Sequence, residues 1–419
     1  MNDVMAVVLG GGRGSRLFPL TQFRSKPAVP IGASYRLIDV AVSNCIHAGL
    51  RRIFVITQYQ SESLNRHVAN TYKFDAFASG FIDLLAAEQT DSREGDWFTG
   101  TADAVRKCMK HIGRESWSAL AILSGDQLYR MDLQEMIKVH QERKAAVTVA
   151  MKAVSEELTS GFGIMKVDGT GRVIHFDEKP PRERLPGLAS KVPGRAGPTY
   201  LASMGIYVFE RRAIELALAE SDSVDFGKHV LPAMLDKARV QAYLYDGYWE
   251  DVGTVRSYFD ANLALTQSNP EFNFYHPRFP IYSLRTFLAP SRFHDCRVVD
   301  AMVADGCVLD RADVETAVIG IRSRIGRGAR IRHSLVLGAD EYQTALEGDP
   351  SARDQSTPLG IGEGAWIENA IIDKNARIGK NVSIRNRRAL VDHDGDGFFV
   401  RDGIVIVPKG GCLPDGTEI

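Results

Sequence analysis

The residues best suited to chemistry begin at a glycine-rich segment near the start of the chain. A short apolar run, residues 6–9, leads directly into Gly10-Gly11-Gly12-Arg13-Gly14-Ser15-Arg16. Glycines after a buried strand let the backbone approach a ligand and point successive N–H groups at phosphate oxygens. Arginine adds a charge-assisted grip on phosphate. Because the spacing fits neither a P-loop nor the G-x-G-x-x-G motif, the segment predicts a phosphate-binding loop of another kind.

A lysine and two aspartates, far apart in the sequence, could complete such a site. Lys26 precedes a stiffening proline, Asp126 follows an apolar run, and Asp251 stands beside aromatic residues. Mg²⁺ prefers one or two carboxylates together with phosphate oxygens and water. We therefore predict that Asp126 and Asp251 hold Mg²⁺. Each residue also has an ordinary alternative: a solubilising lysine, a turn aspartate and a helix N-cap.

The elements that must position these residues alternate along the first half of the chain. Apolar β-branched runs alternate with segments of helical spacing, which predicts an α/β fold with a mostly parallel sheet covered on both faces. Ligands of such sheets bind beyond the carboxyl ends of the strands. The expected strands are 5–9, 52–57, 118–123 and 146–150, and the expected helices are 36–48, 62–72, 101–112 and 132–143.

The pattern changes in the last third of the chain. We expect an α/β domain over 1–265, a connection over 266–293 that is packed because it is rich in aromatics, and a repeat domain over 294–419. Aliphatics at every sixth position, with two slips of one residue, predict a parallel β-helix with these side chains inside, and the segment 338–360 interrupts it. The alternative is a generic run of short strands. The aliphatic positions are Met302, Val308, Val314, Ile319, Ile325, Ile331, Leu337, Ile361, Ile367, Ile372, Ile378 and Ile384.

Composition excludes several classes of protein. The net charge of -1, from 51 basic and 52 acidic residues, argues against a nucleic-acid partner. The five scattered cysteines predict neither a disulfide framework nor a zinc site, which favours a cytoplasmic location. The apolar run at the N-terminus is too short to span a bilayer, so we expect no membrane partner.

Taken together, several segments resemble the ADP-glucose pyrophosphorylase (glucose-1-phosphate adenylyltransferase) family, especially its plant and cyanobacterial branch. The resemblance covers almost the whole chain. The segments are LGGGRGSRLFPLT from Leu9, KPAVPIGASYRLIDVAVSNC from Lys26, WFTGTADAV from Trp97, SGDQLYRMD from Ser124, GFGIMKVD from Gly161, FDEKP from Phe176, YLASMGIYVF from Tyr200, DFGKHVLP from Asp225, YDGYWEDVGT from Tyr245 and IIDKNARIG from Ile371.

The resemblance implies a Rossmann-like catalytic domain followed by a left-handed parallel β-helix that serves oligomerisation and regulation. It implies synthesis of ADP-glucose and pyrophosphate from ATP and glucose 1-phosphate, with Mg²⁺, for glycogen or starch. It further implies a homotetramer controlled by an anionic allosteric effector.

The resemblance also implies roles for individual residues. Arg16 and Lys26 match the catalytic residues that neutralise the triphosphate, and Asp126 and Asp251 match the metal-binding carboxylates. The residues matched to ATP are Leu9, Gly10, Gly11, Gly12, Gly14, Gln58, Gly100 and Thr101. Those matched to glucose 1-phosphate are Gly163, Glu178, Lys179, Ser203, Tyr207 and Trp249. Those matched to the effector are Lys374 and Lys409.

Two other functions stay open at this point. A related enzyme could use UTP or dTTP, or another sugar phosphate. The chain could also be a non-catalytic regulatory partner, because Gln127 stands where many catalytic members carry histidine. Such partners typically lose the basic pair of the first loop, whereas Arg16 and Lys26 are both present here.

Overall fold

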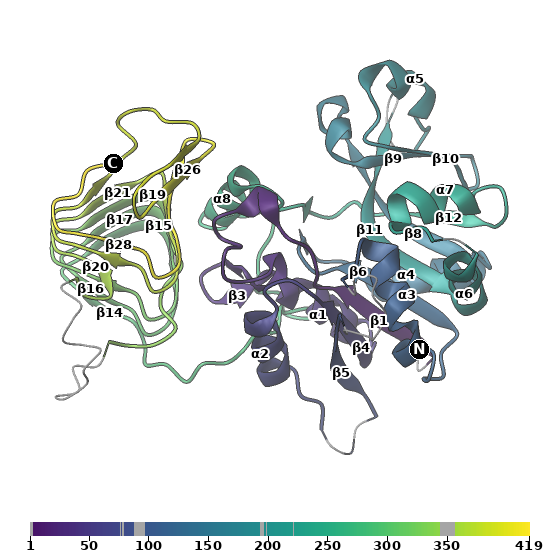
Figure 1. Ribbon diagram of the computed structural model, residues 1–419, viewed down its shortest axis with the longest axis horizontal. Coiled ribbons are helices and arrows are strands. Elements are labelled where there is room, and N and C mark those ends of the chain that lie inside the picture. The colour runs from purple at the N-terminus through teal and green to yellow at the C-terminus, as the bar shows by residue number, and fades with distance from the viewer. Residues whose placement is uncertain are drawn as a thin grey trace.

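The computed structural model describes residues 3–75, 77, 79–87, 97–192, 197, 199–220, 222–343 and 357–419. Two bodies lie side by side in Figure 1: an N-terminal α/β domain, coloured purple to teal, and a β-helix, coloured green to yellow. Helix α8 (Val255–Ala264) lies on the side of the N-terminal domain that faces the β-helix.

A mixed sheet of nine strands forms the centre of the N-terminal domain. Its order is β10-β9-β11-β6-β1-β4-β5, and β8 pairs with both β11 and β12. Seven of these strands point the same way, while β10 and β11 run opposite to them. The bounds are β1 Val4–Leu9, β4 Arg52–Thr57, β5 Phe81–Ala86, β6 Ala119–Ser124, β8 Val147–Val154, β9 Gly163–Val167, β10 Val173–Glu178, β11 Tyr200–Glu210 and β12 Val240–Leu244.

Helices cover both faces of this sheet. Alternate residues of β1 enter different apolar clusters: Val4, Ala6 and Val8 pack with α1, α2 and α4, whereas Met5 and Val7 pack with α3, α6 and α7. This alternation is the period of two expected for a strand buried on both sides. The bounds are α1 Leu37–His47, α2 Glu62–Thr71, α3 Thr101–Ile112, α4 Leu133–Glu142, α5 Leu185–Leu188, α6 Arg211–Ala219 and α7 Leu231–Met234.

The eight elements expected from hydrophobic periodicity are all present. The strand at 52–57 and the helix at 101–112 have the expected ends. The other six are displaced by one or two residues, apart from β8, which continues four residues further than expected, to Val154.

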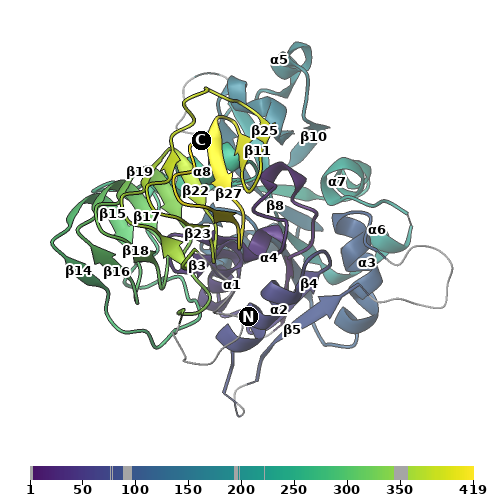
Figure 2. The ribbon, with the colours of Figure 1, turned by 60° about the vertical axis from the view of Figure 1, so that its left-hand side comes forward.

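The β-helix stacks short parallel strands in successive coils, which Figure 2 displays as layers. Aliphatics in register fill its interior, as in the pairs Val314↔Ile331 and Ile361↔Ile378. The bounds are β14 Arg292–His294, β15 Arg297–Val303, β16 Val308–Asp310, β17 Asp313–Ile319, β18 Arg324–Ile325, β19 Arg330–Val336, β20 Gly360–Ile361, β21 Trp366–Glu368, β22 Ala370–Ile372, β23 Arg377–Ile378, β24 Ser383–Ile384, β25 His393–Asp394, β26 Phe399–Arg401, β27 Ile404–Val407 and β28 Cys412–Leu413.

The prediction that every sixth aliphatic points inward is wrong at three positions. Val308 is only partly buried, because its neighbours Cys307 and Leu309 fill the interior of that coil instead. Met302 and Leu337 join the apolar cluster of the N-terminal domain. The interrupting segment expected at 338–360 lies partly outside the described residues.

The two domains share an apolar contact. Leu335, Ile371 and Ile404 of the β-helix belong to the same cluster as Tyr258 and Phe259 of α8. The segment between α8 and β14 also packs on the N-terminal domain, since the Phe274 ring stacks on Tyr35 with centroids 4.1 Å apart. None of the described helices has both the length and the hydrophobicity needed to cross a membrane.

Candidate active site

The carboxyl ends of three parallel strands meet at one edge of the sheet. Leu9, the last residue of β1, is opposite Ile56 of β4 and Ser124 of β6. The residues that follow each strand therefore emerge together. They are the glycine-rich segment after β1, Gln58 after β4 and Asp126 after β6.

The glycine-rich segment is an open loop held at both ends. Gly10 N–H donates to Ile56 O over 2.7 Å, and Thr21 Oγ donates to Gly14 O over 3.0 Å. Gly14 has φ +58°, which glycine adopts at little cost, and a Cβ there would lie 3.3 Å from Cβ of Lys26. Glycine at this position thus lets the loop lie directly against Lys26. Gly11 and Gly12 are exposed, so their backbone is accessible to a ligand.

A two-stranded ladder brings the distant aspartates together. β7 (Leu128–Tyr129) pairs antiparallel with β13 (Trp249–Glu250), with Leu128 opposite Glu250. Asp126 precedes one strand and Asp251 follows the other, so both carboxylates lie at the same end of the ladder. Lys26 Nζ contacts Asp126 Oδ2 at 2.9 Å and Asp251 Oδ1 at 3.0 Å.

These three charges stabilise one another. Burial lowers the pKa of Lys26, but Asp126 and Asp251 outweigh burial and raise it above its usual value. Burial raises the pKa of Asp126, but Lys26 and the Ser124 hydroxyl outweigh it, so the net shift is downward. Lys26 and Asp126 therefore both stay ionised at neutral pH.

Arg16 lies beside this cluster. A Cβ placed on Gly253 would be 3.3 Å from Arg16 Nη2 and 3.3 Å from both carboxylate oxygens of Asp251. The Arg16 side chain is exposed. The glycine loop is thus flanked by two cations, Arg16 and Lys26, and by two carboxylates.

The two aspartates suit a divalent cation of the Mg²⁺ type. Their oxygens already converge on one cationic atom, and their side chains remain 27% and 29% exposed. Mg²⁺ needs just such a pair, with phosphate oxygens and water supplying its other ligands. The described residues hold no group of three or more His, Cys, Asp or Glu that could bind a metal without substrate.

A second group of predicted residues lies at the start of β9, at the end of β10 and within β11. Gly163 is opposite Glu178 in the β9–β10 ladder, and a Cβ on Gly163 would lie 2.7 Å from Glu178 Oε2. Lys179 is exposed at φ +50°, a conformation stabilised by its N–H bond to Phe162 O. The Phe162 ring contacts Trp249, with centroids 4.9 Å apart.

Two further predicted residues, Ser203 and Tyr207, lie on β11, on either side of a break in its register with β8. Burial raises the pKa of Tyr207, a hydrogen bond with Ser203 opposes this, and the charges of Asp225 and Glu178 add to it. Burial also raises the pKa of Glu178, opposed by Lys179. These groups therefore share one half-buried environment.

Three of the predicted nucleotide residues, Gln58, Gly100 and Thr101, make contacts close to the start of α3. Gln58 uses both ends of its amide on the backbone of Phe98, at 2.8 and 3.2 Å. Gly100 caps α3 where a Cβ would lie 2.2 Å from Val224 O. Thr101 Oγ donates to Asp225 Oδ2 over 3.1 Å.

Comparison with known families agrees with this architecture. Residues 5–268 match the nucleotidyl transferase family, and residues 286–418 match the GLGC left-handed parallel beta-helix domain. The chain belongs to the nucleotidyl transferase family. The two matches in this order are the hallmark of the ADP-glucose pyrophosphorylase architecture, which confirms the family resemblance and the fold class. The chain is a sugar-phosphate nucleotidyltransferase of that type.

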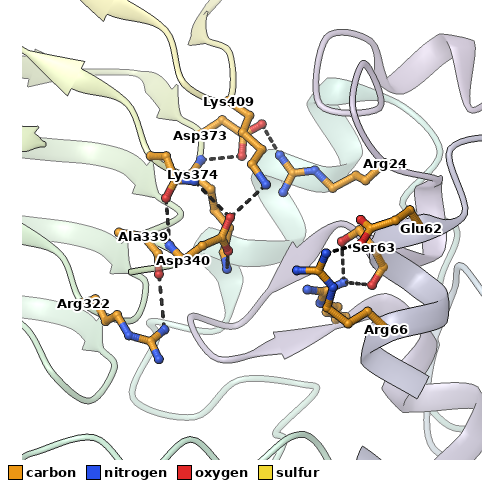
Figure 3. A network of polar contacts seen from close by, with 12 residues as sticks. Arg24, Glu62, Ser63, Arg66, Arg322, Ala339, Asp340, Asp373, Lys374 and Lys409 are labelled. Atoms are coloured by element: carbon orange, nitrogen blue, oxygen red, sulfur yellow. Dashed lines mark hydrogen bonds and ion pairs between the residues drawn. The ribbon is translucent and has the colours of Figure 1, made fainter. Parts of the chain in front are cut away.

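The two lysines expected to bind an effector lie far from the glycine loop in sequence but close to each other. In this nucleotidyl transferase, Lys374 Nζ contacts Asp340 Oδ1 at 2.7 Å, and Lys409 Nζ contacts Asp340 Oδ2 at 2.8 Å (Figure 3). Burial lowers the pKa of Lys374 and Asp340 opposes this, while Arg24 and Arg36 add to the lowering. The predicted effector residues thus lie in a field of positive charge at the domain boundary.

Sequence analysis missed two residues of this transferase site. Ser124 donates a hydrogen bond to Asp126. Asp225 accepts a hydrogen bond from Thr101, and its charge helps to raise the pKa of Glu178. Asp225 also caps the helical turn Phe226–Val230 by accepting from Lys228 N. Asp225 begins one of the segments that carry the family resemblance, but local pattern there predicts only a helix cap and not a contact with α3.

Proposed function

We propose that this chain is a glucose-1-phosphate adenylyltransferase, which makes ADP-glucose and pyrophosphate from ATP and α-D-glucose 1-phosphate for α-glucan synthesis. One observation carries the proposal: Asp126 and Asp251 converge on Lys26 directly beside the glycine loop. A nucleotidyl transfer needs this combination, because the triphosphate must be gripped, its charge neutralised and its α-phosphorus held in line.

The proposed reaction is a direct displacement. A phosphate oxygen of glucose 1-phosphate forms a bond to the α-phosphorus of ATP, and the bond from that phosphorus to the bridging oxygen breaks. The electron pair leaves with pyrophosphate. Backbone N–H groups of the glycine loop and the Arg16 guanidinium stabilise the negative charge on the departing group.

Lys26 has two tasks in this proposal. In the present structure its ammonium neutralises the two carboxylates. Mg²⁺ bound by Asp126 and Asp251 would neutralise charge on the phosphate oxygens. Lys26 Nζ, held beside the glycine loop, would pair with oxygens of a triphosphate bound at that loop.

The sugar phosphate belongs, in this proposal, beside the start of β9, the end of β10 and the register break within β11. Glu178 accepts hydrogen bonds from sugar hydroxyls, and the exposed Lys179 ammonium pairs with the phosphate. Trp249 and Phe162 offer an apolar wall to the ring. Lys179→Ala should raise the KM for glucose 1-phosphate about tenfold and leave the KM for ATP within about twofold. A rise confined to ATP would contradict the assignment of the sugar side.

Lys374 and Lys409 are proposed to bind a small anionic effector. A phosphorylated metabolite or inorganic phosphate offers the oxygens that two neighbouring ammonium groups prefer. The site lies next to the Arg24–Asp373 ion pair, which joins the N-terminal domain to the β-helix. Arg24 is two residues from Lys26, so the effector site and the catalytic lysine are linked through one short segment.

A non-catalytic regulatory partner is the second candidate, and Gln127 is the observation that favours it. Activity of the purified chain by itself separates the two. A homotetramer, implied by the family resemblance, and a cytoplasmic location, favoured by the scattered cysteines, complete the proposal.

The nucleotide is tested with a panel of ATP, UTP and dTTP, each with glucose 1-phosphate. Sugar-nucleotide formation should be fastest with ATP by a factor of at least about ten. A preference for UTP or dTTP would overturn the proposed substrate while leaving the reaction class intact.

A further inference from the structure

Gln127 lies between the carboxylate pair and the sugar side, and the mechanism proposed above gives it no task. It follows Asp126 directly and precedes β7, the strand that pairs with β13. Its side chain is almost fully buried, with 9% of the residue exposed. The ladder that aligns the two aspartates therefore also fixes the position of Gln127.

The Gln127 amide holds the indole ring of Trp249. Trp249 Nε1–H donates to Gln127 Oε1 over 3.1 Å in a buried contact. An indole N–H can only donate, so this bond determines which end of the amide faces Trp249. Phe162 packs against the same indole, with ring centroids 4.9 Å apart. The tilt of the Trp249 ring thus depends on one packing contact and one hydrogen bond.

The other end of the amide faces the sugar side. A Cβ on Gly205 of β11 would lie 3.9 Å from Gln127 Nε2. Gly205 has φ +69° and stands where the pairing of β11 with β8 is interrupted, between Ser203 and Tyr207. Gln127 thereby connects Trp249 to the strand that carries two of the predicted sugar-phosphate residues.

We propose that Gln127 is a positioning residue for the sugar-phosphate site: its side-chain carbonyl fixes the Trp249 indole as a wall of the pocket. The inference rests on the proposed function, because the role of Trp249 at the sugar belongs to it. The backbone ladder of β7 and β13 aligns the carboxylates, whereas the Gln127 side chain bonds directly to the Trp249 indole. Gln127 therefore acts on sugar-phosphate binding more than on the chemical step.

Gln127→Met and Gln127→His test this role in the full chain. Methionine has a similar length but offers the indole only a weak thioether acceptor, so the KM for glucose 1-phosphate should rise about tenfold. The KM for ATP and kcat should change by less than about threefold. A ring nitrogen of histidine can accept the indole N–H, so Gln127→His should restore most of the lost affinity. Equal losses for ATP and glucose 1-phosphate, or no recovery with histidine, would overturn the inference.

A double-mutant cycle with Trp249→Phe provides the second test. Phenylalanine has no N–H to hold, so adding Gln127→Met to Trp249→Phe should change the KM for glucose 1-phosphate by less than about twofold. A tenfold further loss would mean that Gln127 does not act through Trp249.

The wild-type chain distinguishes failure of the inference from failure of the proposed function. If the wild type forms no sugar nucleotide from glucose 1-phosphate, the proposed function fails. The fluorescence contributed by Trp249, obtained by subtracting the spectrum of the matching Trp249→Phe chain, then tests Gln127 alone. The Trp249 spectrum should shift in Gln127→Met and should match that of the wild type again in Gln127→His. An unchanged spectrum in Gln127→Met would overturn the inference.

Discussion

At the scale of single residues, Lys26, Asp126 and Asp251 form one charge-balanced unit. Asp126→Asn keeps the size of the side chain and can still accept from Ser124, but it removes one of the two charges facing Lys26. We expect turnover to fall by a factor of about 10² or more, as for other preorganised electrostatic groups. Steady-state kinetics measure this, with Asp236→Asn, an exposed carboxylate, as control. Near-normal turnover of Asp126→Asn would remove it from the mechanism.

Gly163 offers a second residue-scale test, because its missing side chain leaves the space that Glu178 occupies. A Cβ there would lie 2.7 Å from Glu178 Oε2 and 2.7 Å from the Phe176 ring. Gly163→Ala should displace the carboxylate and raise the KM for glucose 1-phosphate about tenfold. Gly161→Ala is the matched control, since a Cβ at Gly161 meets nothing within 4 Å. Equal affinities in the two variants would contradict the role of Glu178.

At the scale of elements, α4 packs on β8 through a neutral histidine. His140 is 4% exposed, and its ring Nδ1 contacts the Thr148 hydroxyl at 3.0 Å. Burial lowers the pKa of His140 to about 4, against a small opposing effect of Glu210. The unfolded chain therefore takes up the proton first as pH falls, so this histidine costs stability below about pH 6.5.

His140→Gln should flatten that pH dependence while keeping a partner for Thr148. Between pH 7.5 and pH 5 the wild type should lose about 2 kcal/mol of unfolding free energy that the variant does not lose. Urea unfolding at the two pH values measures the difference. An identical loss in both chains would mean that His140 is protonated in the folded state.

Sequence patterns predicted the long elements well but missed the short ladder on which the site depends. β1, β4 and α3 carry six or more residues of clear periodicity, so local pattern identifies them. β7 and β13 have two residues each, too few for any period, and they pair across more than a hundred positions. Asp126 and Asp251 could therefore be proposed as partners on chemical grounds, whereas the ladder that joins them was visible only in three dimensions.

At the scale of the whole molecule, the β-helix contributes charge as well as apolar surface to the domain boundary. Burial raises the pKa of Asp340, but Lys374 and Lys409 outweigh it and lower the pKa far below its usual range. Asp340 therefore contacts both lysines of the effector site proposed above and would compete with a soluble anion for them.

Asp340→Asn should therefore strengthen anion binding. We expect the affinity for inorganic phosphate, measured by calorimetry, to rise about tenfold because the lysines lose an internal competitor. Asp394→Asn, which breaks the ion pair with Arg401 elsewhere on the β-helix, is the control and should leave the affinity unchanged. Unchanged or weaker binding in Asp340→Asn would exclude competition by Asp340.

The contact between the two domains could not be predicted from the sequence. Hexapeptide spacing predicts which side chains are buried, but not whether they face the coil interior or a neighbouring domain. Met302 and Leu337 fit the repeat and yet pack with the N-terminal domain. Arg24 and Asp373, 349 positions apart, form a buried ion pair that no local pattern indicates.

The most direct test of the central claim is pyrophosphate release by the purified wild-type chain alone, supplied with ATP, glucose 1-phosphate and Mg²⁺. If the Lys26 cluster is a nucleotidyl-transfer site, pyrophosphate and ADP-glucose should appear in equal amounts, and Asp251→Asn should abolish both. No release by the wild type, with or without phosphorylated effectors, would contradict the account and leave the chain as a non-catalytic partner.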